Sequence, residues 1–430
     1  MDRTVEKTAG VLLGVIGLVY YVQSSINTGY LYATRNDFAH LYIAGYLADR
    51  GGDFFDFPIV YKTHHYLRIP TGLNPFVYPP FFALVLIPLS RVSYETAWMI
   101  FTLLSHAAYL GSLALLVRIL DREAERPGFW WGVLLALSGC FYPLFKTYSA
   151  GQMNTFMLGV LTGGWYLLQN KRDKAAGILL GLGAAVKITP GFLLLYLAWK
   201  KRWAGVRTGL AVLFLSGCLS LLWLGKEVHV SFLDMVHDMR YGSSTWSDLE
   251  HKYNAVSQHY DIDPFNQAPS ALWYRLLTRN EAARDIYQGI ADFPALARLL
   301  SYVTALSVLG WLLWITRRDP ESTAVEEYGL WTLGMLLLPS LFWDHYLVQA
   351  VLAIAAALRL ALDGKTRGIW GLALGLALLA IPFHHNNPLF QHGWMTLGMA
   401  IKLYGVLLTG AFLWLNRPEK AAPLFSRSLL

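Results

Sequence analysis

The chain has 430 residues, of which 55% are hydrophobic and 15% charged, with a formal net charge of +7. Soluble domains carry roughly 25% charged residues, so this composition excludes an ordinary soluble enzyme and indicates a protein surrounded by lipid. The basic residues lie mostly in short clusters at the ends of apolar runs, which fits cytoplasmic membrane loops better than a nucleic-acid-binding face. We therefore expect membrane lipids, and no nucleic acid, as partners.

The first apolar run, Val11–Ile26, follows a charged N-terminus, and no convincing small-residue cleavage site comes after it. It is interpreted as an uncleaved transmembrane helix that starts inside the cell. Residues 27–76 then form a first outer loop. Apolar residues recur in this loop at helical spacing, which predicts an amphipathic helix near the membrane surface. They are Phe38, Leu41, Tyr42 and Gly45.

Asp37 stands at the start of this predicted helix and allows two interpretations. In the first, Asn36 or Asp37 merely caps the helix N-terminus. In the second, Asp37 is a general base that takes a proton from an acceptor hydroxyl near the membrane.

The number of spans between residues 77 and 224 is ambiguous. Seven spans before Lys226 would place the basic segment 170–174 outside, against the positive-inside rule. The alternative makes 76–89 and 175–199 re-entrant or broken helices, which membranes tolerate where such helices line a polar site. With five more spans after Leu296, we expect about twelve spans in a single membrane domain, 1–430.

Lys187 is the most unusual residue of this region, because it lies in the otherwise apolar stretch Leu182–Pro190. A lysine at the centre of a membrane helix costs roughly 2.5–3.5 kcal/mol. Such residues mark function by default, and here an anionic group such as a phosphate would be the partner. The alternative is a lysine that snorkels from a short helix ended by Pro190.

Residues 226–294 form a second outer loop, with ten acidic against six basic residues. Farther on, two segments without Lys or Arg, 339–346 and 383–394, should also face outward. The first contains Trp343-Asp344-His345-Tyr346, which is either an interfacial aromatic belt or a polar group beside a leaving phosphate. The second contains His384-His385, where a metal site is the less favoured interpretation.

Six short motifs occur in an order that resembles one known family. They are Asn36-Asp37-Phe38 with Tyr42-Ile43-Ala44-Gly45, Tyr78-Pro79-Pro80-Phe81, Gly151-Gln152-Met153-Asn154, Lys187-Ile188-Thr189-Pro190, Arg275 within Ala271–Leu276, and Trp343-Asp344-His345. This order, from Asp37 to Ala350, resembles the GT-C superfamily, specifically glycosyltransferase family 87 of the polyprenyl-phosphate-mannose-dependent type. Two departures are Ala268 after Asn266-Gln267, where the family often has a hydroxyl residue, and Pro339-Ser340 in place of Ser-Pro.

The resemblance implies an all-α, polytopic transmembrane bundle with two long outer loops. It implies an inverting glycosyltransferase that moves a hexose, most often mannose, from a polyprenyl-phosphate donor to a lipid or glycan acceptor. The active site would lie on the periplasmic or extracellular side of the cell membrane. Asp37 matches the catalytic acid, and Lys187 and His345 match positions near the donor phosphate, assisted by Arg275. Tyr78, Gln152 and Asn154 are further candidates for substrate binding.

No cofactor is expected, because protein cations can hold the phosphate, and a divalent metal is left open. A transporter or lipid flippase is the main alternative function, but two large outer loops without an internal repeat argue against it. An O-antigen-type polymerase or ligase is a second alternative, in which arginine-centred loops would be expected instead of an early Asp.

Overall fold

A computed structural model describes residues 3–31, 33–121, 126–241, 263, 265–279, 288–316, 324–383 and 387–417. Helices dominate this part of the chain, and its only extended pairings are isolated bridges such as the one between Asn266 and Trp343. The expected all-α class is confirmed. Contacts group the chain into two compact units. The first comprises Met1–Leu194 and Trp203–His237, and the second comprises Leu195–Arg202 and Asp238–Leu430.

The first unit holds the N-terminal helices. In chain order they are α1 (Arg3–Tyr21), the π-helix η1 (Val22–Thr28), α2 (Gly29–Leu31), α3 (Asn36–Ala48), α4 (Phe57–Tyr66), α5 (Pro80–Ser90), α6 (Tyr94–Leu120), α7 (Pro127–Cys140), α8 (Tyr142–Ala150), α9 (Asn154–Gln169), α10 (Asp173–Val186), the 3-10 helix η2 (Thr189–Gly191) and most of α12 (Trp203–Asp238). Helix α12 is interrupted at Gly225, where φ is 80° and ψ is 174°.

The second unit holds most of α11 (Phe192–Trp199) and the later helices. These are α14 (Pro269–Leu277), α15 (Pro294–Ile315), α16 (Val325–Leu337), η4 (Asp344–Ala350), α17 (Val351–Leu362), α18 (Ile369–Ala380), η5 (Pro388–Phe390), η6 (Gly393–Ala400) and α19 (Ile401–Leu415). Much of the expected second outer loop, residues 242–262, 264 and 280–287, lies outside the described residues. The part that is described begins as the end of α12 and includes α14.

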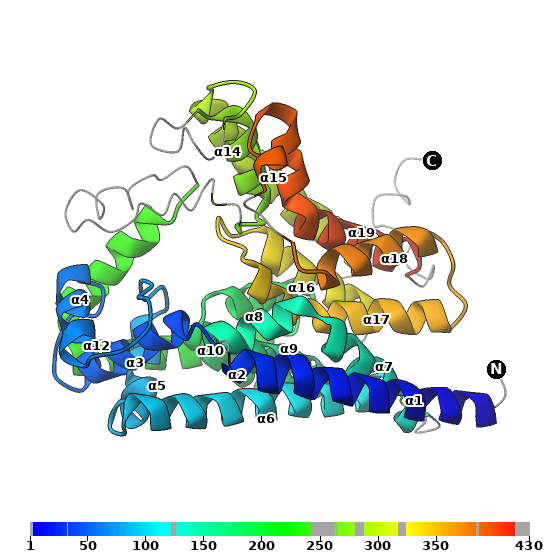
Figure 1. The fold of residues 1–430 in the computed structure, drawn as a ribbon, viewed down its shortest axis with the longest axis horizontal. Helices are drawn as coiled ribbons and strands as arrows, with labels where there is room; N and C mark the ends of the chain where they lie inside the picture. The colour runs from blue at the N-terminus through cyan, green and yellow to red at the C-terminus, as the bar shows by residue number, and fades with distance from the viewer. Residues whose placement is uncertain are drawn as a thin grey trace. The chain divides into compact units, whose positions relative to one another are not determined.

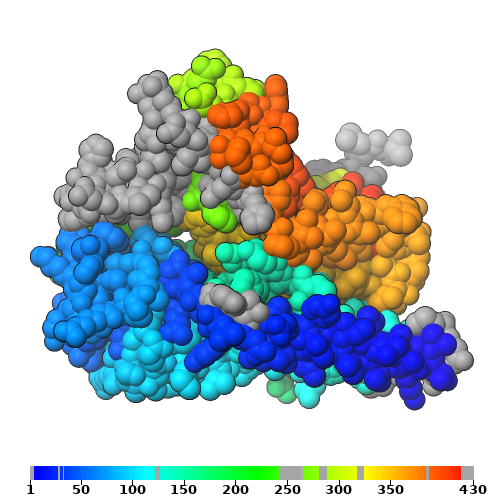
Figure 2. Space-filling view, in the orientation of Figure 1, coloured from blue at the N-terminus to red at the C-terminus, as the bar shows by residue number. Residues whose placement is uncertain are grey.

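Six segments among the described residues are long and apolar enough to cross a membrane, or seven if the bent pair α7–α8 is one span. They are Thr4–Asn27, Tyr94–Leu120, Trp203–Asp238, Pro294–Ile315, Asp344–Leu362 and Gly393–Leu415. Large apolar side chains on these segments are exposed, among them Leu222 (86%) and Phe214 (70%) on α12. Helix α1, dark blue in Figure 2, likewise presents apolar side chains at the surface of the first unit. Such surfaces fit lipid, whereas the expected count of about twelve spans is not confirmed.

Two stretches that the sequence left ambiguous contain short or interrupted helices. Helix α5 has 11 residues, about 17 Å at about 1.5 Å per residue, against a hydrocarbon core of about 30 Å. Within 175–199, α10 ends at Val186, and a 3-10 turn separates it from α11. Helix α7 is also bent by 65° where it meets α8. The chain therefore places several helix ends inside apolar sequence.

Helix α1 lies along α7 in the first unit (Figure 1), and glycines bring the two backbones together. A Cβ at Gly132 would lie 2.1 Å from the carbonyl oxygen of Gly10, and one at Gly10 would lie 2.7 Å from the Cα of Phe129. Small residues permit this close approach between membrane helices, which are held mainly by van der Waals packing.

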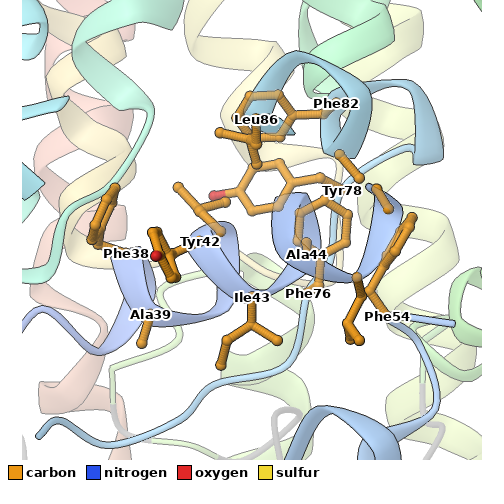
Figure 3. Close-up of a cluster of buried hydrophobic side chains, with 14 of the residues drawn as sticks. Phe38, Ala39, Tyr42, Ile43, Ala44, Phe54, Phe76, Tyr78, Phe82 and Leu86 are labelled. Atoms are coloured by element: carbon orange, nitrogen blue, oxygen red, sulfur yellow. The ribbon is translucent and has the colours of Figure 1, made fainter. Parts of the chain in front are cut away.

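The core of the first unit surrounds α3. Figure 3 shows Phe54, Phe76, Tyr78 and Phe82 packed around this helix, and all four are almost fully buried. Helix α5 packs directly on α3, where a Cβ at Gly45 would lie 2.7 Å from the carbonyl oxygen of Leu86. Helix α3, which carries Asp37, is thus fixed on several sides.

Candidate active site

Helix α3 begins after a strained residue. Arg35 has a left-handed backbone with φ 53° and ψ 10°, which is uncommon for residues other than glycine. Several contacts hold it there: its N–H donates to the Ser149 carbonyl (3.0 Å), and its guanidinium pairs with Glu95 (2.6 Å) and lies 5.3 Å from the ring centre of Trp98. Strain of this kind persists where the surrounding contacts impose it, often at functional sites.

Asp37 occupies the first turn of α3 and is 6% exposed. Its Oδ1 accepts a hydrogen bond of 2.5 Å from the Asn74 amide. The interpretation of Asn36 or Asp37 as a helix cap is wrong, because Arg35 holds the cap position and no side chain caps this helix. The partial positive charge of the helix N-terminus favours an anion at Asp37.

The expected amphipathic helix at the membrane surface requires a correction. The helix forms, but eleven of its thirteen residues are buried, so it is a core helix of the first unit. Its polar residues suggested a water-facing side. Instead Asp37 and His40 face other polar side chains inside the protein.

Tyr78 and Gln152 are brought together from distant motifs. Tyr78 is 2% exposed, and its hydroxyl donates to Gln152 Oε1 (2.9 Å). The residue before Gln152, Gly151, lies close to α3. Its φ of 78° is left-handed, and a Cβ there would lie 2.5 Å from Cβ of Phe38. Only glycine fits this position without strain. Gly151 therefore packs directly on the first turn of α3.

Lys187 lies at the end of α10 in extended backbone and is 6% exposed. Its ammonium donates to Asn154 Oδ1 (3.1 Å) and lies 5.8 Å from the ring centre of Tyr78. It also interacts electrostatically with Asp37. A buried lysine bonded to a buried asparagine is not snorkelling, so the structure contradicts that alternative. Asn154 is the first residue of α9, so the ammonium lies at the positive end of a helix.

Two residues of this cluster escaped the sequence interpretation, Asn74 and His40. Asn74 stands in an unremarkable Asn-Pro pair just before the Tyr78 motif, and only the fold brings it to Asp37. His40 is 3% exposed, and its ring stacks on Tyr78 at 6.0 Å between centroids. Burial lowers the pKa of His40 to about 4, although the Asp37 carboxylate and the Asn36 carbonyl act to raise it. The imidazole is therefore neutral at pH 7.

Arg275 belongs to the second unit, on α14, and is 1% exposed. One of its terminal nitrogens donates to two backbone carbonyls, those of Asp263 (2.9 Å) and Asn266 (2.8 Å). These bonds fix the chain that leads into α14. Arg275 therefore shapes the segment that leads into α14.

His345 lies in the same unit, in the Trp343-Asp344-His345 turn that begins η4, and is partly buried. Asn266 and Gln267 hold this turn: the Phe342 N–H donates to Asn266 Oδ1 (3.0 Å), and the Gln267 N–H donates to the Phe342 carbonyl (2.6 Å). The segment fixed by Arg275 and the His345 turn are thus joined by backbone bonds. His345 itself packs edge-on against Tyr346.

Of the seven candidate residues, the first unit contains Asp37, Tyr78, Gln152, Asn154 and Lys187. Direct contacts link the last four, and Asp37 interacts electrostatically with Lys187. In the other unit, Asn266 links Arg275 to the turn that carries His345. Among the described residues, no three His, Cys, Asp or Glu side chains gather where they could hold a metal ion. His384 and His385 lie outside that part of the chain. The expectation that no metal is needed stays a prediction.

The family model of glycosyltransferase family 87 matches residues 76–339, more than half of the chain. The matched region includes Tyr78, Gln152, Asn154, Lys187 and Arg275 but neither Asp37 nor His345. No solved structure matches the chain significantly.

Three curated relatives are polyprenol-phosphate-mannose-dependent mannosyltransferases. An α-(1-2)-phosphatidylinositol pentamannoside mannosyltransferase of Mycobacterium tuberculosis (strain CDC 1551 / Oshkosh) is 26% identical over 357 residues, which cover 80% of this chain and 71% of the relative. Its counterpart in Mycolicibacterium smegmatis is 29% identical over 206 residues, 46% of each chain. A phosphatidylinositol mannoside mannosyltransferase of Mycobacterium tuberculosis (strain ATCC 25618 / H37Rv) is 26% identical over 154 residues, 33% of this chain and 36% of the relative.

Proposed function

The chain belongs to glycosyltransferase family 87, and from this we propose that it transfers mannose from a polyprenyl-phosphate carrier to a lipid acceptor on the outer face of the membrane. The names of the relatives support the donor, and they suggest a phosphatidylinositol mannoside as the first acceptor to test. Nothing in the relatives supports the transporter or flippase alternative.

The proposed reaction is a single inverting displacement at the anomeric carbon. The acceptor oxygen forms a bond to this carbon while the bond from the carbon to the phosphate oxygen breaks. The acceptor proton passes to Asp37, and polyprenyl phosphate leaves as a monoester. One base is enough for this chemistry, because no covalent sugar–enzyme intermediate needs a second carboxylate. The bond from Asn74 and the position of Asp37 in the first turn of α3 support it as an oriented acceptor of that proton.

Lys187 is proposed to bind the donor phosphate. This phosphate carries one negative charge as a diester and up to two as the leaving monoester, so charge builds on its oxygens during the reaction. A fixed ammonium in a water-poor site stabilises that charge more in the transition state than in the ground state. The bond to Asn154 and the start of α9 add support, because both place Lys187 where an anion is favoured.

Tyr78, Gln152 and Asn154 are proposed to orient the substrates around this pair. Their mutual bonds are side chain to side chain, so a small shift lets each contact a sugar or phosphate oxygen. From the second unit, His345 is proposed as a donor-side residue on the strength of its motif. The hydrogen bonds from the Arg275 guanidinium to backbone carbonyls support an indirect role, in which Arg275 shapes the segment joined to the His345 turn.

One observation carries the proposal: the buried carboxylate of Asp37 and the buried ammonium of Lys187 interact electrostatically within apolar surroundings. Asp37→Asn tests it, because asparagine keeps the shape and the contact with Asn74 but cannot accept the acceptor proton. General-base catalysis contributes about 10²–10⁴-fold, so the transfer rate should fall at least 100-fold.

The assay measures transfer of labelled mannose from polyprenyl-phosphate-mannose to a phosphatidylinositol mannoside by the purified full-length protein. Asp49→Asn is the matched control, since Asp49 ends the same helix but forms an exposed pair with Arg91. Its rate should stay within about threefold of wild type. Full activity of a folded Asp37→Asn protein would disprove the mechanism.

A further inference from the structure

His40 lies one helical turn after Asp37 on α3, so the two side chains project from the same side of the helix. It is 3% exposed, and neither ring nitrogen makes a well-formed hydrogen bond with any described residue. The Asn36 carbonyl and the Asp37 carboxylate are the polar groups that act on the ring.

Packing holds the His40 ring in one orientation. One face stacks on Tyr78, with an interplanar angle of 29°, and Phe76 meets the ring nearly edge-on at 75° and 6.2 Å. Figure 3 shows Phe76 and Tyr78 lying together beside α3. Since Tyr78 also contacts Gln152 and Lys187, His40 belongs to the same cluster as the proposed catalytic residues.

A buried polar atom without a hydrogen bond is rare in native proteins and calls for an explanation, because it has lost its water without gaining a partner. The simplest explanation at an active site is a partner that arrives with the substrate. A neutral imidazole offers one N–H donor and one bare nitrogen acceptor. A hydroxyl group, itself both donor and acceptor, matches this pair, whereas a phosphate accepts only.

We propose that His40 hydrogen-bonds a hydroxyl group of the sugar held beside Asp37 and thereby positions that sugar for transfer. This inference rests on the proposed function. The hydroxyl belongs either to the mannose of the donor or to the sugar of the acceptor, and the chemistry is the same in both cases. His40 does not take the acceptor proton, which passes to Asp37.

Two variants test this role with separate KM measurements for polyprenyl-phosphate-mannose and for a phosphatidylinositol mannoside. His40→Leu removes the hydrogen-bonding atoms and should raise the KM of one substrate about 10-fold, equivalent to about 1.4 kcal/mol. His40→Gln retains a donor and an acceptor at similar reach and should recover most of that loss. A rise for the donor assigns the hydroxyl to the donor mannose, and a rise for the acceptor assigns it to the acceptor sugar.

Deoxy-sugar substrates give a second readout that a purely structural role would not change. In the wild type, removal of the hydroxyl that His40 contacts should cost a similar factor of about 10. In His40→Leu this penalty should shrink toward one, whereas His40→Gln should keep most of it. If His40→Leu fails to fold, His40→Phe replaces it, since phenylalanine keeps a ring against Tyr78 but has no hydrogen-bonding atom. His106→Leu is the control, since the His106 ring already bonds the Tyr21 hydroxyl (2.6 Å), and it should leave both KM values unchanged.

The inference is wrong if both KM values of folded His40→Leu stay within twofold of wild type. It is also wrong if the folded variant without hydrogen-bonding atoms, His40→Leu or His40→Phe, shows the same deoxy penalties as the wild type. Either result, with normal wild-type transfer and an inactive Asp37→Asn protein, would leave the proposed function intact. No mannose transfer by the wild type would instead refute the proposed function, and this inference with it.

Discussion

Replacement of Lys187 by methionine removes the buried ammonium while keeping an unbranched side chain of similar length. Two effects on stability oppose each other. The variant no longer buries a charge, which costs roughly 2.5–3.5 kcal/mol for a lysine on insertion scales. It also loses the charged hydrogen bond to Asn154 (3.1 Å), a type of bond worth about 1.5–3 kcal/mol. We therefore expect the free energy of unfolding to change by between about −0.5 and +2 kcal/mol.

The effect of the same replacement on the rate should be much larger. One preorganised group that stabilises developing negative charge is worth about 10²–10³-fold in kcat, or roughly 2.7–4 kcal/mol. The rate of mannose transfer at saturating donor should fall by that factor, and donor binding should also weaken. A loss of activity without a loss of stability separates a functional lysine from a structural one.

The assay combines initial transfer rates of the purified protein with thermal unfolding followed by tryptophan fluorescence. Lys146→Met is the matched control, because Lys146 is a partly buried lysine of the same unit that lies 5.8 Å from the ring centre of Tyr142. It should keep its rate within about threefold of wild type. A folded Lys187→Met protein with a near-normal rate would refute the phosphate-binding role, as would an equal loss in the control.

Two further predictions concern stability. Gly151→Ala should lower the free energy of unfolding by about 2–5 kcal/mol, because the left-handed backbone costs about 1–2 kcal/mol and the new methyl group meets Phe38. The control is Gly111→Ala on α6, where open space surrounds the glycine, and it should be neutral or slightly stabilising. Equal melting temperatures for the two variants would contradict this reasoning. Burial holds the pKa of His40 at about 4. Between about pH 6.5 and 4, the unfolded state therefore binds a proton that the native state does not. The free energy of unfolding should fall by about 3 kcal/mol as the pH drops through this range. His40→Leu should reduce this pH dependence in thermal unfolding measured from pH 4 to 7, and an unchanged pH profile would show that His40 is not the responsible group.

The sequence indicated candidate residues of the first unit where a residue conflicts with its surroundings or belongs to a motif. Lys187 stands out because a charge in an apolar run is costly, and Asp37, Gln152 and Asn154 stand in motifs with turn residues. Asn74 and His40 carry no such signal. Their importance comes from tertiary contacts with Asp37 and Tyr78, which residue spacing along one chain does not contain.

The fold was harder to predict at two places. Helix α3 has the spacing of an amphipathic helix, but spacing alone does not tell whether a polar side faces water or other buried polar groups. The span count depended on apolar runs such as 76–89, where hydrophobicity predicts burial equally well for a crossing helix and for a short one like α5. Helix class was predictable because the apolar runs are long, whereas helix ends depend on prolines and glycines whose effect is set by their neighbours.

The contact of Gly151 with Phe38 joins two chain segments that lie more than a hundred residues apart in sequence. Asp37 adjoins Phe38, and the residues that contact Tyr78 and Lys187 follow Gly151 directly. The Gly151 backbone packs against Cβ and the backbone nitrogen of Phe38, atoms whose positions are set by the main chain. For the proposed reaction, this packing predicts that the positions of carboxylate and ammonium are set during folding, so that little free energy is spent on rearranging charges when transfer begins.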